Sequence, residues 1–106
     1  MMWKDDRSNY AQVAYEAMQS GRRIAVKCCD NPQGHIYLHK YEDGDCAVWV
    51  WCSACGAFAH FDGVIGDIVW ENCESVDYEQ LAAIPDYLES IKEVVDDHSG
   101  RHLKGE

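Results

Sequence analysis

The sequence lacks any long apolar run, and this absence excludes the simplest kind of membrane protein. No stretch approaches the ~18 consecutive apolar residues that mark a spanning helix. The opening residues, Met1 to Asp6, contain no apolar segment of the signal-peptide type. We therefore expect a cytoplasmic protein with no membrane partner.

Basic residues are scarce as well, with 9 Lys and Arg against 19 Asp and Glu and a net charge of −10. Within 41–97, Lys92 is the one base among fourteen acidic residues. The negative electrostatic field of these acidic residues disfavours binding to nucleic acid, whose phosphates are anionic. It favours a basic protein partner, or it serves solubility alone. The candidate partner-binding residues are Glu42, Asp43, Asp45, Asp62, Asp67, Glu71 and Glu74.

Recognisable catalytic motifs are also missing. The chain has no Gly-rich phosphate loop, nucleophile elbow or metalloprotease motif. Nothing in the sequence fixes the geometry of its carboxylates, and solvated surface positions are their usual place. We therefore expect a non-catalytic protein and assign no catalytic residue.

Hydrophobic periodicity predicts an α+β fold in a single domain spanning 1–106. Apolar residues at 3.6 spacing indicate an N-terminal helix over 8–20, with Gly21 as its C-terminal cap. Alternating residues and strong turn signals predict an antiparallel β meander over 23–70. Its first strand covers 23–28, and Cys46 to Cys52, apolar on both faces, is its central buried strand.

The last third of the chain is predicted to be helical over 77–98. Asp77 and Gln80 form a capping box for a short turn. Pro85 suits the first position of the next helix, which we expect Gly100 to end. The helices would flank the meander.

The chain contains six cysteines, and disulfides are rare in the cytosol, where we expect the protein to be. Metal binding, redox chemistry or burial would therefore explain these cysteines. Cys52 and Cys55 are separated by two residues and followed by Gly56. Two thiolates at this spacing grip one metal ion from a tight turn, and glycine permits the positive φ that this turn tends to require. The pair lies between two strand-like segments, where a zinc knuckle sits.

Upstream, Cys28, Cys29 and His35 flank a second turn, with 16 residues between His35 and Cys52. On these residues the chain resembles the zinc-ribbon family over about 24–61. The resemblance implies zinc-ribbon-like hairpins around structural zinc. It departs from the family in its first knuckle, where Asn31 or Pro32 stands in place of a second cysteine.

The predicted ligands are Cys29, His35, Cys52 and Cys55, with Cys28 or His60 as substitutes. Cys29 is preferred because strand alternation turns Cys28 toward the core. A degenerate knuckle, whose thiols pack as small core residues, is the alternative. Four protein ligands would close the site and make any zinc structural.

Trp51 and the cysteine pair also look like the Trp-Cys-x-x-Cys motif of thioredoxins. In that family the first cysteine opens a helix, which lowers its pKa. Here Gly56 and the alternating residues 57–61 predict a strand instead. A thiol-disulfide oxidoreductase acting through Cys52 and Cys55 therefore remains only an alternative.

Together, these patterns favour an acidic protein-binding protein, such as an immunity protein or inhibitor that neutralises a basic nuclease toxin. The acidic block over 41–97 would steer association and occupy a groove built for phosphates. A zinc-ribbon-like accessory module of a larger complex is the second hypothesis. The sequence sets neither the identity of the partner nor the oligomeric state.

Overall fold

The structure is a computed structural model that describes residues 2–64 and 70–105; for residues 63 and 64 only the backbone is described. It is a mixed α/β fold with a four-stranded sheet in the order β1-β5-β4-β3 and a two-stranded pair, β2-β6. The elements are β1 (Lys4–Asp5), α1 (Arg7–Ser20), β2 (Arg22–Arg23), β3 (Gly34–Lys40), β4 (Cys46–Cys52), β5 (Ala57–Val64), the 3₁₀ turn η1 (Tyr78–Gln80), α2 (Asp86–Ser90), α3 (Lys92–His102) and β6 (Lys104–Gly105).

The three consecutive strands β3, β4 and β5 pair antiparallel, and β1 adds a parallel edge to β5. All seven residues of β4 are buried, as expected for a central strand without polar alternation. In the β3–β4 register His35 lies opposite Trp51 and Tyr37 opposite Trp49. These residues share one face of the sheet, because directly opposite residues point the same way.

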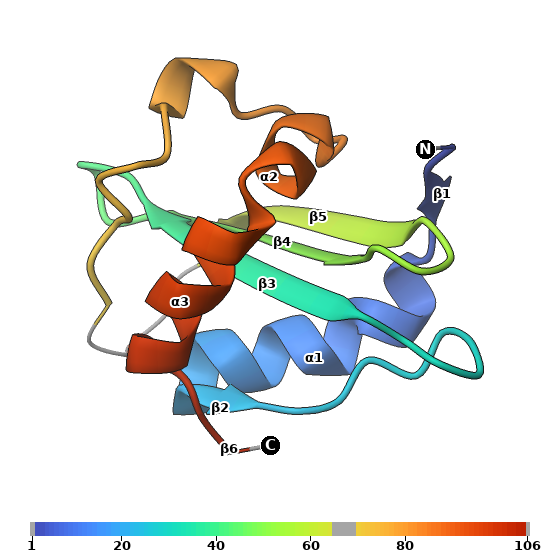
Figure 1. Ribbon diagram of the computed structural model, residues 1–106. Coiled ribbons are helices and arrows are strands. Elements are labelled where there is room, and N and C mark those ends of the chain that lie inside the picture. The colour runs from blue at the N-terminus through green and yellow to red at the C-terminus, as the bar shows by residue number, and fades with distance from the viewer. Residues whose placement is uncertain (1, 65–69, 106) are drawn as a thin grey trace.

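The helices cover the two faces of this sheet (Figure 1). On the Trp51 face, the indole N–H of Trp51 donates to Glu89 of α2 over 3.0 Å, and α3 packs against β3. On the other face α1 packs against β4 and β5. Cys52, which faces away from Trp51, accordingly lies near Tyr10 of α1. The core is thus built on both faces of β4.

Helix α1 begins at Arg7 and closes on Gly21, whose φ of 61° is the left-handed conformation expected of a C-terminal cap. Not every apolar residue of this helix faces the sheet, and Tyr15 is 57% exposed. The face that α1 turns toward the sheet consists of residues spaced i, i+3, i+4, i+7 and i+8, as in an amphipathic helix. These residues are Tyr10, Val13, Ala14, Ala17 and Met18.

The strand predicted over 23–28 is wrong beyond Arg23. β2 covers only Arg22–Arg23 and pairs in parallel with β6, where Arg22 lies opposite Lys104. Because β2 does not pair with β3, no hairpin forms there, and the predicted pair of zinc-ribbon-like hairpins is not confirmed. Cys28 and Cys29 lie in the loop that leads into β3.

The C-terminal helical region also differs from the prediction. The helix expected between Pro85 and Gly100 is broken at Ile91, whose φ is −122°. Helix α3 runs through Gly100 to His102, so glycine does not end it. Its last turns pack on Trp70, with ring centroids 5.1 Å from His98 and 4.8 Å from His102. This packing outweighs the weak helix propensity of glycine.

At the end of the meander predicted over 23–70, Val64 is the last residue of β5 and Trp70 lies outside any strand. Residues 65–69 fall outside the described residues. Among the described residues, no helix combines the length and the apolar character needed to cross a membrane.

Candidate metal centre

The first arm of the site is the reversal between β4 and β5. Cys52 ends β4, and the backbone N–H of Gly56 donates to the Cys52 carbonyl over 3.0 Å. Gly56 has a φ of 80°, which confirms the positive φ expected after Cys55. Residues 57–64 then return as β5. Cys52 therefore ends a strand and opens no helix.

The second arm is the loop that carries Cys28 and Cys29. It approaches β3 so closely that a Cβ built on Gly34 would lie 2.7 Å from Cγ2 of Val26. The backbone N–H of Ser53 donates to the Gln33 carbonyl over 3.0 Å, which joins this loop to the Cys52–Cys55 turn. The lack of a side chain at Gly34 thus lets the two arms meet.

The two arms bring four cysteine sulfurs together: Cys28, Cys29, Cys52 and Cys55, all within 4.8 Å of one another. Cys29 Sγ lies 3.9 Å from both Cys28 Sγ and Cys52 Sγ, and Cys28 Sγ lies 3.2 Å from Cys55 Sγ. We call these four residues the cysteine cluster.

The size of this cluster fits a tetrahedral thiolate site. With Zn–S bonds of about 2.3 Å, the sulfurs of a regular tetrahedron lie about 3.8 Å apart. The separations in the cluster, 3.2 to 4.8 Å, bracket that edge. The residues present therefore fit a zinc ion, and Cys28, Cys29, Cys52 and Cys55 would hold it.

The thiols of the cluster differ in acidity. Burial alone would raise the pKa of Cys52, but backbone N–H groups of Gln33, Cys55 and Ala54 hold it at about 6. The Gln33 nitrogen lies 3.4 Å from Cys52 Sγ. Burial raises the pKa of Cys28 to about 12 and also raises that of Cys29. Of these three thiols, Cys52 therefore ionises most readily, and a bound cation would offset the charge of further thiolates.

A buried hydroxyl group lies beside this cluster. Tyr10 is 1% exposed, and its hydroxyl has no hydrogen-bond partner among the described residues. The hydroxyl interacts with the Cys28 thiol and lowers its pKa against the larger effect of burial. A thiolate at Cys28 would supply the acceptor that this hydroxyl needs.

The two histidines considered as ligands lie outside the cysteine cluster. His35 Nδ1 lies 2.8 Å from an Asp96 carboxylate oxygen, and Nε2 lies 2.7 Å from the Ser53 hydroxyl. His60 on β5 stacks on Trp49, with ring centroids 4.6 Å apart.

Cys28, predicted only as a substitute, lies in the cluster with the three predicted cysteines. The adjacent pair Cys28–Cys29 was the available signal, and sequence reasoning treated it as a choice between two.

His35 instead belongs to a network that supports the turn from outside. Its partner Ser53 donates to Glu89 of α2 over 2.6 Å, and Glu89 also accepts from Trp51 and Lys92. Burial would raise the pKa of Glu89, but these three donors lower it below its usual value. Sequence reasoning missed both Glu89 and Asp96, because nothing local marks a carboxylate that folds back onto a turn.

The seven predicted partner-binding acids separate into groups. Glu42, Asp43 and Asp62 line depressions near Tyr41 and Tyr78, and Asp45 lies in the β3–β4 turn. The other two described acids, Glu71 and Glu74, line a different depression beside α3. Asp67 lies outside the described residues. The acidic surface is therefore not one continuous site.

The cysteine cluster can bind a metal or exchange electrons. Cys52 is 0% exposed, so its low-pKa sulfur cannot reach an exposed disulfide of a substrate in this structure. Four protein ligands would occupy all four coordination positions of a tetrahedral metal ion and leave none open for a substrate or water. The arrangement therefore suits a structural ion better than a reactive centre.

Comparison with known proteins finds no matching family model, no matching curated protein and no matching solved structure.

Proposed function

We propose that this chain is a non-catalytic binding protein that is held together by structural zinc and that neutralises a basic protein partner. The observation that carries the proposal is the cysteine cluster, whose four sulfurs lie within 4.8 Å. Zinc bound there would join the β4–β5 turn to the loop before β3. In small zinc proteins such binding supplies folding free energy on the order of 10 kcal/mol.

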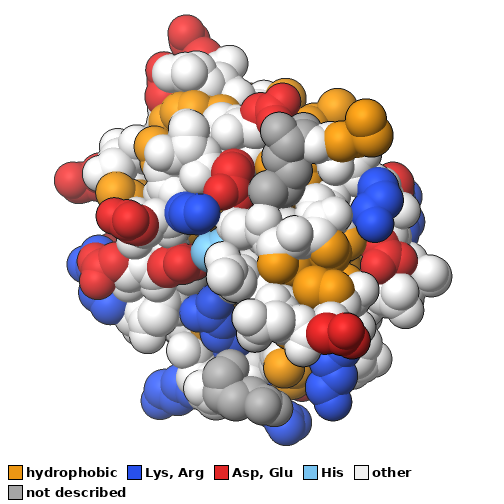
Figure 2. Space-filling view, turned by 45° about the vertical axis from the view of Figure 1, so that its right-hand side comes forward, with side chains coloured by type: hydrophobic (Ala, Val, Ile, Leu, Met, Phe, Trp, Pro, Cys, Tyr) orange, Lys and Arg blue, Asp and Glu red, His pale blue; other side chains and the backbone are white. Residues whose placement is uncertain are grey.

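The charge distribution supports the binding role. In Figure 2, Asp and Glu are scattered over the upper and middle parts of this face, and Lys and Arg lie among them as well as toward the lower edge. The net charge of −10 would speed association with a partner of opposite charge. A basic nuclease toxin is the partner class we propose, as for an immunity protein, because carboxylates can occupy a groove that evolved for phosphates.

Two alternatives make different demands. An accessory module of a larger complex would need the same zinc but no basic partner. A thiol-disulfide oxidoreductase would use the low pKa of Cys52, which is the observation in its favour. The burial of that sulfur disfavours it.

Capture of a partner from the native host, followed by measurement of its association rate, tests the proposed binding role. We expect the zinc-loaded protein to retain a basic protein from its native host. We also expect the association rate to fall at least about tenfold between 0.05 and 0.5 M salt, because the Debye length shrinks across that range. Stopped-flow fluorescence of the purified pair measures this rate. A neutral or acidic partner whose association rate is indifferent to salt would contradict the proposal and favour the accessory module.

A further inference from the structure

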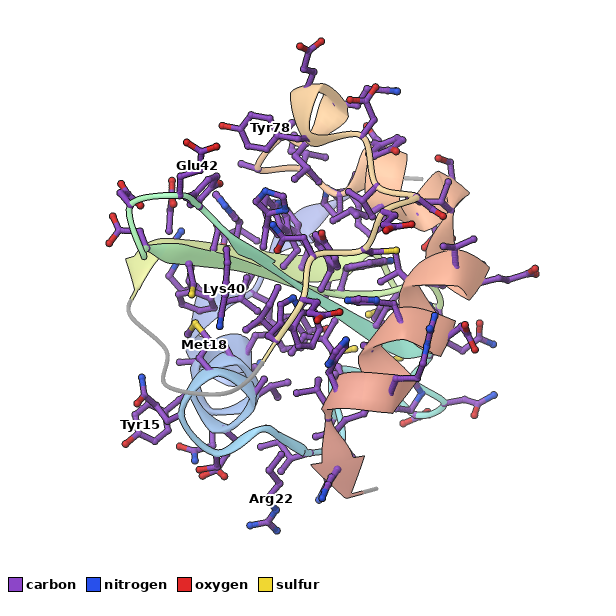
Figure 3. The ribbon with its side chains drawn as sticks, turned by 90° about the vertical axis from the view of Figure 1, so that its left-hand side faces the viewer. Tyr15, Met18, Arg22, Lys40, Glu42 and Tyr78 are labelled. Carbon is purple, nitrogen blue, oxygen red and sulfur yellow. The ribbon has the colours of Figure 1, made fainter. Side chains whose placement is uncertain are left out.

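Two adjoining depressions lie at the end of the sheet where β3 turns into β4. Their volumes are about 580 and 380 Å³, and Tyr41 and Tyr78 line both. We name them together the tyrosine pocket. Figure 1 shows η1, which begins at Tyr78, above this end of the sheet, and Figure 3 shows Tyr78 beside Glu42. The cysteine cluster lies at the other end of β4, about 20 Å away for a seven-residue strand.

The walls of the tyrosine pocket are aromatic. The rings of Tyr41 and Tyr78 meet edge to face with centroids 6.0 Å apart. His39 stacks on Tyr78 at 5.2 Å with an interplanar angle of 25°. Burial lowers the pKa of His39, so at neutral pH the ring is uncharged and extends the aromatic surface. Tyr78 itself is 57% exposed and so presents its ring to a ligand.

Carboxylates border both depressions. Glu42 and Asp43 line the larger one, and Asp62 and Glu79 line the smaller one. Burial raises the pKa of Tyr41, and the charges of Asp62 and Asp43, which line these depressions with it, raise that pKa further. Lys40 is the one base among the described lining residues. The potential in the tyrosine pocket is therefore negative.

We propose that the tyrosine pocket receives an arginine side chain of a basic partner protein. A guanidinium lies flat on an aromatic ring while its edge donates to carboxylates, and this pocket offers both surfaces. Lysine suits it less, because an ammonium is more strongly hydrated and lacks the planar fork. This inference rests on the proposed binding to a basic partner and adds the side chain that is recognised and the residues that recognise it.

A tetra-arginine peptide, with tetra-lysine as comparator, tests the inference. In the zinc-loaded protein we expect tetra-arginine to shift the backbone amide NMR signals of Glu42 and Tyr78. We expect Tyr78→Ala to weaken its binding about fivefold or more, because the exposed face of the cation–π contact is lost. Tetra-lysine should bind more weakly and depend less on Tyr78.

Two matched controls are available in the chain. Tyr15 is also 57% exposed but lies at the opposite end of the molecule (Figure 3), so Tyr15→Ala should change tetra-arginine binding less than about twofold. Glu42→Gln with Asp43→Asn should weaken binding, whereas Glu71→Gln with Glu74→Gln, in the depression beside α3, should change it far less. Zinc content and melting temperature report whether each variant folds.

The outcomes separate this inference from the proposed function. Binding that survives Tyr78→Ala and Glu42→Gln/Asp43→Asn but is lost with Glu71→Gln/Glu74→Gln would overturn the tyrosine pocket and leave the basic partner in place. Equal effects of Tyr78→Ala and Tyr15→Ala would overturn the pocket as well. If neither peptide binds at low salt while the protein holds zinc, both the pocket and the basic partner fail.

Discussion

Replacement of Cys52 by alanine is expected to abolish stoichiometric zinc binding and to remove most of the stability that depends on zinc. Cys52 sits at the junction of the two arms, 3.9 Å from Cys29 and at the turn that leads to Cys55. With three sulfurs left, the tetrahedral site is open and its affinity falls by orders of magnitude. Chelation of zinc from the wild-type protein should have a comparable effect, a loss of several kcal/mol in the free energy of unfolding.

Cys46 provides the matched control. Both cysteines belong to β4 and are 0% exposed, but Cys46 lies at the far end of the strand from the cysteine cluster. Cys46→Ala should therefore retain zinc and lose about 1 kcal/mol of packing. Denaturant unfolding with and without chelator, together with metal analysis, measures both effects. Equal behaviour of the two variants, with a wild type that is indifferent to chelator, would refute a structural zinc site.

Gly34→Ala is expected to weaken zinc binding although residue 34 is not a ligand. The new Cβ would lie 2.7 Å from Cγ2 and 2.9 Å from Cβ of Val26, so the segment that precedes Cys28 must move. Overpacking of this kind costs about 1–3 kcal/mol. Because Val26 lies two residues before Cys28, the displacement should also separate the two arms. Unfolding curves and zinc competition titrations should both report a loss.

A second substitution shows whether the contact with Val26 is the cause. Val26→Ala removes both γ-carbons, so in the Gly34→Ala background it should restore part of the zinc affinity, and the two changes should couple in a double-mutant cycle. Gly100→Ala is the control, because nothing lies within 4 Å of a Cβ at that position in α3. Additive losses from the two substitutions, or unchanged zinc affinity in Gly34→Ala, would speak against this role of Gly34.

The parts of the site that the sequence could predict are local ones. The chain reversal at 53–56 follows from two neighbouring strand-like segments with a glycine between them, and the structure places a turn there with Gly56 at φ 80°. The buried central strand follows from an apolar run on both faces of residues 46–52. These features depend on neighbours within a few residues, so a single sequence contains the information.

The rest depends on contacts between distant segments. His35 looked like a ligand because it follows a turn, but its partner Asp96 is 61 residues away. Cys28 and Cys29 both reach the cluster because Val26 packs on Gly34 and because β2 pairs with β6 at the other end of the chain. Tyr41 and Tyr78 likewise meet only through the fold. No local pattern carries these pairings.

X-ray absorption spectroscopy of the zinc-loaded protein tests the central claim most directly. Zinc held by the cysteine cluster should show four sulfur neighbours at about 2.3 Å. A first shell that includes nitrogen at about 2.0–2.1 Å would return a histidine such as His35 or His60 to the site. Failure to bind stoichiometric zinc at all would contradict the account entirely.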